Sequence, residues 1–159
     1  MERIQRIFEH PVYRRNFNGI QEAEKDRRFC RHDLQHFLDV ARIIRIYDLE
    51  DGGGLPEEIV YAAALLHDIG RYEELTCGTP HDAAGAELAE EILTDCGFAA
   101  GDIGMIKDAI VGHRNKDMCG GKLAAYLYRA DKQSRCCFAC SAADECKWSD
   151  EKKNHVISI

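Results

Sequence analysis

Residues 62–70 read AAALLHDIG, an apolar run that ends in a histidine, an aspartate and a glycine. Pro56 stands at a first-turn position ahead of this run, and two glutamates follow it near the positive end of a helix. We therefore expect a helix that opens at Pro56, passes through His67 and stops at Gly70. The apolar side chains direct the histidine and the aspartate that follow them toward the protein interior.

Helical spacing of apolar residues recurs on both sides of this run, whereas the alternating β-branched runs typical of strands are missing. The sequence therefore predicts an all-α fold, a single compact helical bundle. Thr79 and Pro80 form a helix start signal in which the threonine is the N-cap. Gly52, Gly53 and Gly54 end the expected helix over 33–49. Together the helices cover about residues 2–26, broken near Pro11, then 33–49, 56–67, 79–96, 103–113 and 123–131.

Length and composition limit the class of protein. A chain of 159 residues with 45% hydrophobic content fits one globular domain, with a core over about 32–135, an N-terminal helical brace over 1–31 and a cysteine-rich segment over 136–159. It has no run of the roughly 20 apolar residues that a membrane helix needs, and its first residues are charged where a signal peptide is apolar. We expect a cytoplasmic protein without a membrane partner.

The net charge of −7 argues against nucleic acid as a partner, because phosphate backbones bind basic surfaces. It leaves a small phosphorylated substrate open, since a few local cations suffice for one. A homo-oligomer is equally compatible with the sequence.

Several titratable side chains fall on apolar helix faces. His36 shares a helical stripe with Val40, and His113 shares one with Ile110. Asp131 follows apolar neighbours on an inward face, where an isolated carboxylate would cost several kcal/mol of desolvation. A single histidine is equally well explained as a core residue bonded to a carbonyl. The whole set, however, favours a divalent cation, because imidazole and carboxylate are its normal ligands.

The order of a helical His36, then His67 and Asp68 within LLHDIG, then a later Asp131 resembles the HD-domain superfamily of metal-dependent phosphohydrolases. The resemblance spans about residues 32–135. It implies a helical bundle in which these four residues hold a first metal ion. Iron, manganese, cobalt, nickel and zinc can all accept such ligands.

His81 and His113 stand where the two-metal branch of that superfamily places its extra histidines. The resemblance implies a second ion, with Asp68 as the bridge and with Asp68, His81 and His113 as catalytic residues that support attack of an activated water on phosphorus. The alternative is that the two histidines contact substrate phosphate. The motif spacing is also similar to HD-domain diadenosine tetraphosphatases, which makes a dinucleoside polyphosphate one candidate substrate beside other nucleotides.

Cations near these residues are candidate phosphate clamps, each weighed against an ordinary solvated surface charge. His32, four residues before His36, is expected to support the site through hydrogen bonds or to cap the helix, rather than to ligate the metal. The candidate clamps are Arg71, Arg114, Lys116, Lys132 and Arg135.

The eight cysteines are too sparse for a disulfide-stapled secreted domain, so we expect reduced thiols or metal ligands. Cys30 and Cys119 could each supply a fourth ligand to a site formed by the late cysteines. The favoured alternative is that these thiols pack as small hydrophobes against Trp148 and Phe138. The spacing that fits a zinc or an iron–sulfur site belongs to Cys137, Cys140 and Cys146, which follow Cys136.

Two other functions share this ligand order. Some relatives use a mixed-valent diiron pair to activate oxygen and cleave carbon–carbon or carbon–phosphorus bonds, and others would bind a nucleotide or a protein without catalysis. The complete ligand set favours a hydrolase over a silent module. Hydrolysis of a small phosphoester or nucleotide is the function that the sequence predicts.

Overall fold

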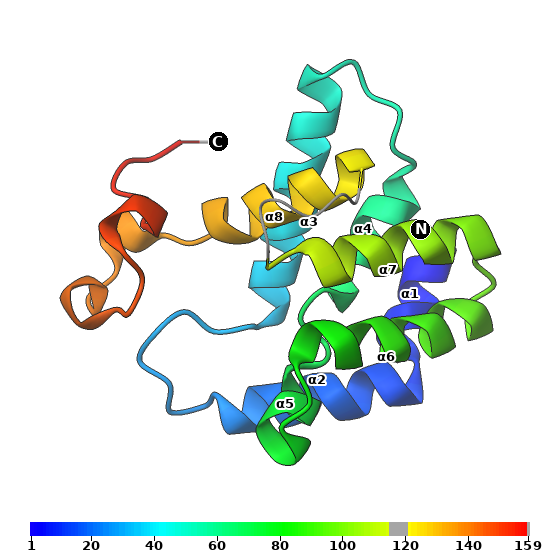
Figure 1. Cartoon of the computed structure of the whole chain (residues 1–159), viewed down its shortest axis with the longest axis horizontal. Helices are drawn as coiled ribbons and strands as arrows, with labels where there is room; N and C mark the ends of the chain where they lie inside the picture. Colours follow the sequence, from blue (N-terminus) through cyan, green and yellow to red (C-terminus); the bar gives the residue numbers. More distant parts are fainter. Residues whose placement is uncertain (115–120, 159) are drawn as a thin grey trace.

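The structure is a computed structural model that describes residues 1–114 and 121–158. Throughout these residues the regular elements are helices, and none is a strand (Figure 1). The predicted all-α class is therefore confirmed. The α-helices are α1 (Glu2–Glu9), α2 (Pro11–Ala23), α3 (Leu34–Glu50), α4 (Glu57–Leu66), α5 (Arg71–Cys77), α6 (His81–Asp95), α7 (Ala100–Gly112) and α8 (Gly121–Gln133).

Helix α4 forms the centre of the bundle. Every residue from Ile59 to Leu66 except Tyr61 is buried. The helix packs against α1, α3, α7 and α8, and those neighbours pack in turn, α3 and α7 each against α8 and α7 against α6 (Figure 1). The quoted apolar run therefore delivers the residues that follow it to a point where several helices meet.

The N-terminal pair braces this centre. The predicted break occurs at Pro11, where His10 is extended and its ring accepts a hydrogen bond from the Val12 backbone N–H at 3.3 Å. The Glu58 carboxylate on α4 lies 2.7 Å from the N-terminal amino group and 2.7 Å from Arg3. These hydrogen bonds lower the pKa of Glu58 to about 2. Helix α1 is thus tied directly to α4, and α2 packs on α5 and α6.

Gly70 does not end a helix in the way that we expected. Helix α4 ends at Leu66, a turn follows, and Gly70 precedes α5 with an ordinary φ of −73°. A glycine is required there by close packing, because a Cβ would lie 2.2 Å from the His81 carbonyl oxygen and 2.4 Å from the Gly85 nitrogen. Gly70 therefore sets how closely α6 approaches the residues after α4.

The start of α6 also differs from the prediction. Pro80 occupies the N-cap position without a side-chain cap, and the exposed Thr79 lies outside the helix. The prediction of a Thr79 cap was wrong, and His81 is the first helical residue. The short helix α5 was not predicted, because its seven residues carry no buried side chain and hence no apolar stripe.

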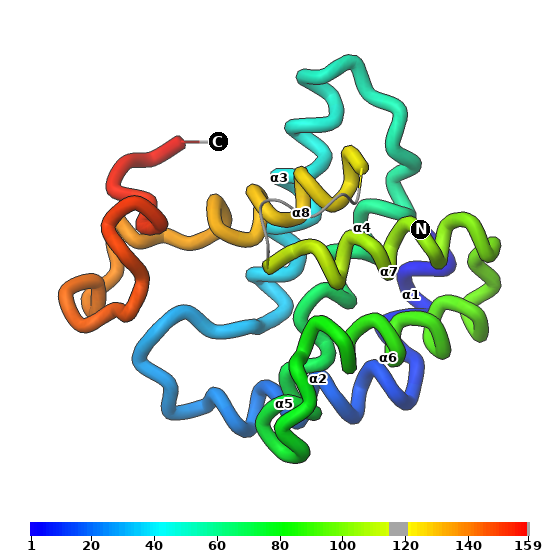
Figure 2. Tube along the Cα trace, viewed as in Figure 1, coloured from blue at the N-terminus to red at the C-terminus, as the bar shows by residue number. Residues whose placement is uncertain are grey.

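The chain after α8 has no α-helix within the described residues and forms the short 3-10 helices η1 (Cys137–Ala139), η2 (Ala143–Glu145) and η3 (Asp150–Lys152). This C-terminal segment extends from the end of α8, away from α1 (Figure 2). It is attached in part by Asn154, whose side-chain amide donates to the carbonyls of Lys132 and Arg135, both at 2.8 Å. Across the described ranges, no helix combines the length and the apolar character that crossing a bilayer demands.

Candidate metal centre

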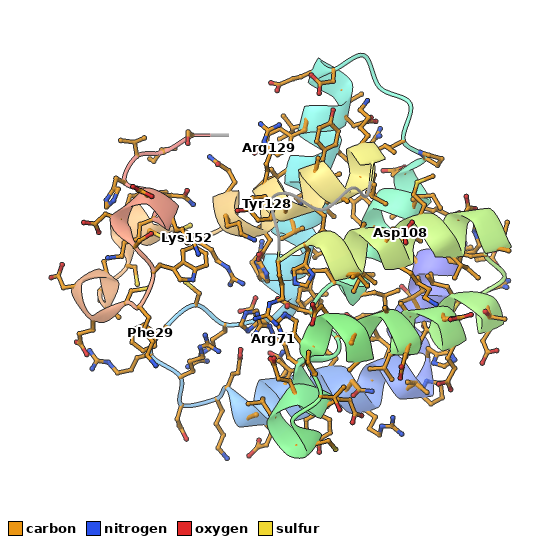
Figure 3. All side chains as sticks on the ribbon, viewed as in Figure 1. Phe29, Arg71, Asp108, Tyr128, Arg129 and Lys152 are labelled. Atoms are coloured by element: carbon orange, nitrogen blue, oxygen red, sulfur yellow. The ribbon has the colours of Figure 1, made fainter. Side chains whose placement is uncertain are left out.

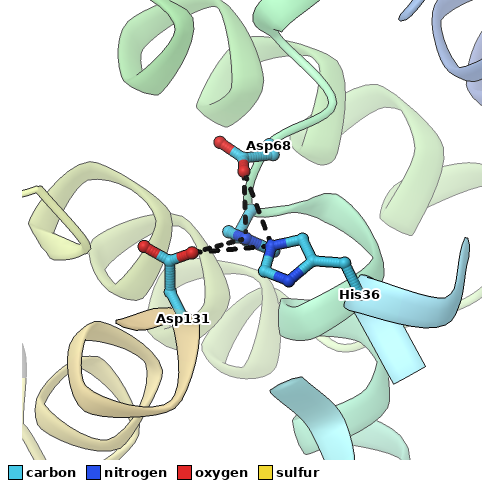
Figure 4. A group of neighbouring side chains, drawn as sticks. His36, Asp68 and Asp131 are labelled. Carbon is cyan, nitrogen blue, oxygen red and sulfur yellow. Dashed lines mark ion pairs between the residues drawn. The ribbon is translucent and has the colours of Figure 1, made fainter. Parts of the chain in front are cut away.

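Four of the predicted ligands meet inside the bundle, where α3, α8 and the turn after α4 come together. His36 comes from α3, His67 and Asp68 follow α4, and Asp131 lies on α8, and each offers one ligand atom within 4.8 Å of the others (Figure 4). His36 Nε2 lies 3.5 Å from Asp131 Oδ1, and His67 Nε2 lies 3.2 Å from Asp68 Oδ2. Three elements distant in sequence therefore converge on one group of nitrogen and oxygen atoms.

A second group shares Asp68. Nε2 of His81 lies 3.5 Å from Asp68 Oδ1, and Nε2 of His113 lies 3.6 Å from the same oxygen. His36 and His67 instead face Oδ2. The two oxygens of one buried carboxylate therefore point into two different groups of ligand atoms.

Each of the four imidazoles is oriented from behind by a hydrogen bond at Nδ1. This leaves every Nε2 directed at the carboxylates, the arrangement that second partners impose on metal-binding histidines. The partners are Ser134 Oγ for His36 (3.0 Å), the Ala64 carbonyl for His67 (2.7 Å), Glu74 for His81 (2.7 Å) and the Ile110 carbonyl for His113.

The unsatisfied atoms at this centre fit a cation. Nε2 of His67 and Nε2 of His81 are buried without a hydrogen-bond partner among the described residues, whereas Asp68 Oδ1 has a charged neighbour in Arg71, at 2.8 Å. Orphaned buried polar atoms cost about 1–3 kcal/mol each, which a coordinated metal would remove. The donor set of imidazole nitrogens and carboxylate oxygens is one that a divalent transition metal accepts.

The charge states also suit metal ligation. Burial would raise the pKa of Asp68, but the charges of His67 and Arg71 hold it well below its usual range. Burial lowers the pKa of His36 to about 4, so this imidazole is neutral near pH 7. Burial likewise opposes a charge on His67, yet Asp68 and Asp131 raise the pKa of that imidazole. A metal at His67 therefore competes with a proton.

His32 lies beside this centre. Its Nε2 is 3.6 Å from Asp68 Oδ2, and its Nδ1 is 2.6 Å from Glu24 Oε1. Glu24 also accepts the His32 backbone N–H at 2.8 Å, and these bonds outweigh burial and lower the pKa of Glu24 to about 2. His32 is therefore held by Glu24 with its Nε2 toward Asp68, and the expected supporting role of His32 stays a prediction.

Three predicted phosphate clamps lie against the ligands. Arg71 Nε is 2.8 Å from Asp68 Oδ1, and Lys132 Nζ is 3.1 Å from Asp131 Oδ2. Arg135 Nη2 lies 2.8 Å from His36 Nε2 and 3.6 Å from Asp131 Oδ1. A guanidinium and a metal ion would therefore compete for the nitrogen of His36.

The other two predicted clamps differ. Arg114 has a half-exposed side chain, 3.9 Å from Glu74 and 3.7 Å from Asp82, on the outer side of His81. Lys116 lies outside the described residues.

The late cysteines lie next to this centre. Cys137, Cys140 and Cys146 are partly buried and line a pocket together with Cys30. Within residues 1–114 and 121–158, the groups close enough to hold an ion are the two histidine and aspartate groups. A metal at the cysteines stays a prediction. Phe138 is 44% exposed, whereas Trp148 is partly buried and lines the same pocket as these thiols, so the expected packing of the thiols against the two rings stays a prediction.

Sequence reasoning missed the residues that orient the ligands. Glu74 lies on the unpredicted helix α5, Ser134 Oγ is held by the Asp131 carbonyl at 2.8 Å, and Glu24 lies eight residues before His32. None of these positions has a distinctive local pattern. Each is recognised only by its contact with a histidine, and that contact can be identified only once the fold is known.

Comparison with known proteins agrees with this geometry. The HD domain family matches residues 33–147. This chain belongs to the HD-domain family. An uncharacterized protein of Clostridium beijerinckii (strain ATCC 51743 / NCIMB 8052) is 43% identical over 157 residues, 99% of each chain. The crystal structure of a predicted HD superfamily hydrolase from an uncultured Thermotogales bacterium matches with a TM-score of 0.61 and 28% identity, over 88% of this chain and 80% of the other.

Proposed function

We propose that this HD-domain protein is a phosphohydrolase that uses two divalent transition-metal ions to cleave a small phosphoester or nucleotide. One observation carries the proposal: the two carboxylate oxygens of Asp68 face separate ligand groups, one completed by His36, His67 and Asp131, the other by His81 and His113. A shared carboxylate between two such groups suits a two-metal site for displacement at phosphorus.

In that reaction the carboxylates would bind the metal ions and the nearby cations would bind the phosphate. Asp68 and Asp131 would serve as ligands, because both stay ionised when buried, and neither needs to act as a free base. Bound ions would lower the pKa of a water and stabilise charge on the phosphoryl oxygens. Arg71 and Lys132, each within about 3 Å of a ligand carboxylate, would bind and neutralise those oxygens where water is partly excluded.

A pocket gives the substrate access to this centre. A cavity of about 390 Å³ has Asp131, Arg71, Arg135 and His32 in its wall. Its volume lies within the range of roughly 300–1,000 Å³ that small-molecule sites occupy. A phosphoester that enters there would reach both a predicted ligand and two cations.

The test is phosphate release from a panel of phosphoesters and nucleotides, measured anaerobically with metal-loaded protein. Asp68→Asn should lower kcat/KM on the order of 10³-fold, equivalent to about 4 kcal/mol, because it weakens both ligand groups. Asp108→Asn is the matched control, since Asp108 is exposed on α7, and it should change nothing. Oxygen consumption by an iron-loaded preparation that releases no phosphate would replace this function with the diiron oxygenase.

A further inference from the structure

We infer that the pocket beside Asp131 is built for a mononucleotide, with the phosphate toward the metal centre and the base against Trp148 and Phe29. The inference rests on the proposed function for the placement of the phosphate. It goes beyond it by assigning the C-terminal segment, which carries none of the predicted histidine and aspartate ligands, to recognition of the rest of the substrate.

The wall of the pocket has two sources. Arg71, Asp131 and Arg135 belong to the metal centre or contact it, whereas Phe29 lies on the connection before α3 and Trp148 on the C-terminal segment. Figure 3 shows Arg71 at the start of α5 in the helical bundle and Phe29 on the connection between α2 and α3, on the side of the C-terminal segment. A ligand anchored at the metal centre would therefore extend toward the segment.

The charge of the pocket favours an anion, although the whole chain has a net charge of −7. Asp131 is the one carboxylate among the described residues in its wall. Lys147 is exposed there and has no ion pair within residues 1–114 and 121–158, so its charge is available to a ligand. The other cations of the wall each pair with a carboxylate, Arg27 with Glu24, Arg71 with Asp68, Arg135 with Asp131 and Lys153 with Asp150, so Lys147 supplies the charge that is free for an anion.

The remaining wall is apolar and aromatic. Trp148 and Phe29 are both partly buried and both line the pocket, so aromatic surface is available to a ligand there. Cys30, Cys137 and Cys140 add thiols, which behave as small hydrophobes. Cationic and aromatic groups in one pocket match a phosphate and a base, because every nucleobase has a face that stacks on an aromatic ring.

The size of the pocket favours a mononucleotide. About 390 Å³ lies near the lower end of the range of roughly 300–1,000 Å³ for small-molecule sites. A mononucleotide fits that volume better than a dinucleoside polyphosphate, which carries a second nucleoside. We therefore expect the second nucleoside of such a compound to add no affinity.

Trp148 is the single tryptophan of the chain, so its fluorescence reports on this pocket directly. The probes are the methylenephosphonate analogue of AMP, which resists phosphoester hydrolysis, and the ribose analogue that lacks the base, each titrated into the metal-loaded protein. The AMP analogue should quench the fluorescence saturably and bind about tenfold more tightly than the ribose analogue, a ratio within the range of base stacking on one aromatic ring.

Steady-state kinetics provide a second measurement. Trp148→Ala should raise KM for AMP about tenfold with little change in kcat, and should leave KM for ribose 5-phosphate unchanged. Trp148→Phe, which keeps an aromatic ring, should restore most of the affinity. Lys147→Ala should raise KM for both substrates, whereas Lys152→Ala, an exposed lysine of the same segment outside this pocket, should not.

The outcomes separate the two proposals. Saturable quenching without any phosphate release would overturn the phosphohydrolase and keep the nucleotide pocket. Hydrolysis with equal affinity for the two analogues, or a Trp148→Ala variant that raises KM for both substrates equally, would overturn the pocket and keep the phosphohydrolase.

Discussion

The metal centre and the C-terminal segment are held in opposite ways. At the centre, the ligand histidines are buried and each Nδ1 has a partner that fixes the ring. The segment has no α-helix in its described part, exposes Phe138, and is attached by hydrogen bonds such as those of Asn154. Core packing therefore holds the side chains of the metal centre, whereas the segment is attached mainly by hydrogen bonds and an exposed ion pair.

Gly70→Ala should have the largest effect on stability, because the added methyl group would overlap the backbone of α6 at His81 and Gly85. Overpacking against backbone costs typically 1–3 kcal/mol, and we expect about 3 kcal/mol here. Chemical denaturation measures the free energy of unfolding. Gly104→Ala is the matched control: with no atom within 4 Å of its Cβ, it should be neutral or stabilising by up to about 1 kcal/mol. Equal stability of the two variants would show that α6 is not held at Gly70.

Glu74→Gln should have the next largest effect, because Glu74 accepts from Nδ1 of His81 and so directs Nε2 toward Asp68. Loss of such a partner typically costs 10–100-fold in metal affinity or activity. Titration with Mn²⁺ measures the affinity. Glu73→Gln, at the adjacent position that contacts Cys77 rather than a histidine, should leave it unchanged. An identical decrease in both variants would point to charge in general instead of to the orientation of His81.

Arg28→Ala should have the smallest effect. Arg28 pairs with Glu145 of the C-terminal segment through two hydrogen bonds of 2.9 and 3.1 Å, and both side chains are mostly exposed. Exposed ion pairs contribute about 0–1 kcal/mol, so the melting temperature should fall by a few degrees at most. A loss comparable to that of Gly70→Ala would mean that the segment supports the bundle, and that the two regions are not held differently.

The sequence predicted the fold well where periodicity was strong. The helix that precedes His67 and the stripes that carry His36 and His113 are present, and their side chains are buried. Helix α5 was missed because none of its side chains is fully buried. The N-cap of α6 was predicted at Thr79, one residue before the observed N-cap Pro80, because a threonine before a proline resembles a cap. Local patterns therefore predicted the helices that carry fully buried apolar stripes and missed α5, which packs against α2 and α6 with side chains that are at most partly buried.

The ligands of the candidate site could be predicted because they lie on the apolar stripes, whereas the residues that orient them could not. An ionisable side chain on an apolar stripe is conspicuous in a sequence, whereas Glu74 and Ser134 matter only through a contact that the fold creates. Arg114 looked equivalent to Arg71 in sequence, yet it pairs with Glu74 and Asp82 on the outer side of the site. Proximity along the chain thus predicted that Arg71, Lys132 and Arg135 lie beside the ligand carboxylates, but not that Arg114 pairs with Glu74 and Asp82.

The stoichiometry of bound metal tests the central claim most directly. Equilibrium dialysis against Mn²⁺ with elemental analysis should give two ions per chain for the wild type and one for His81→Ala, because Asp68 then serves only the group with His36, His67 and Asp131. His155→Ala, which removes an exposed histidine, should keep two. One ion per wild-type chain, or two ions retained by His81→Ala, would contradict a pair of ions that shares Asp68.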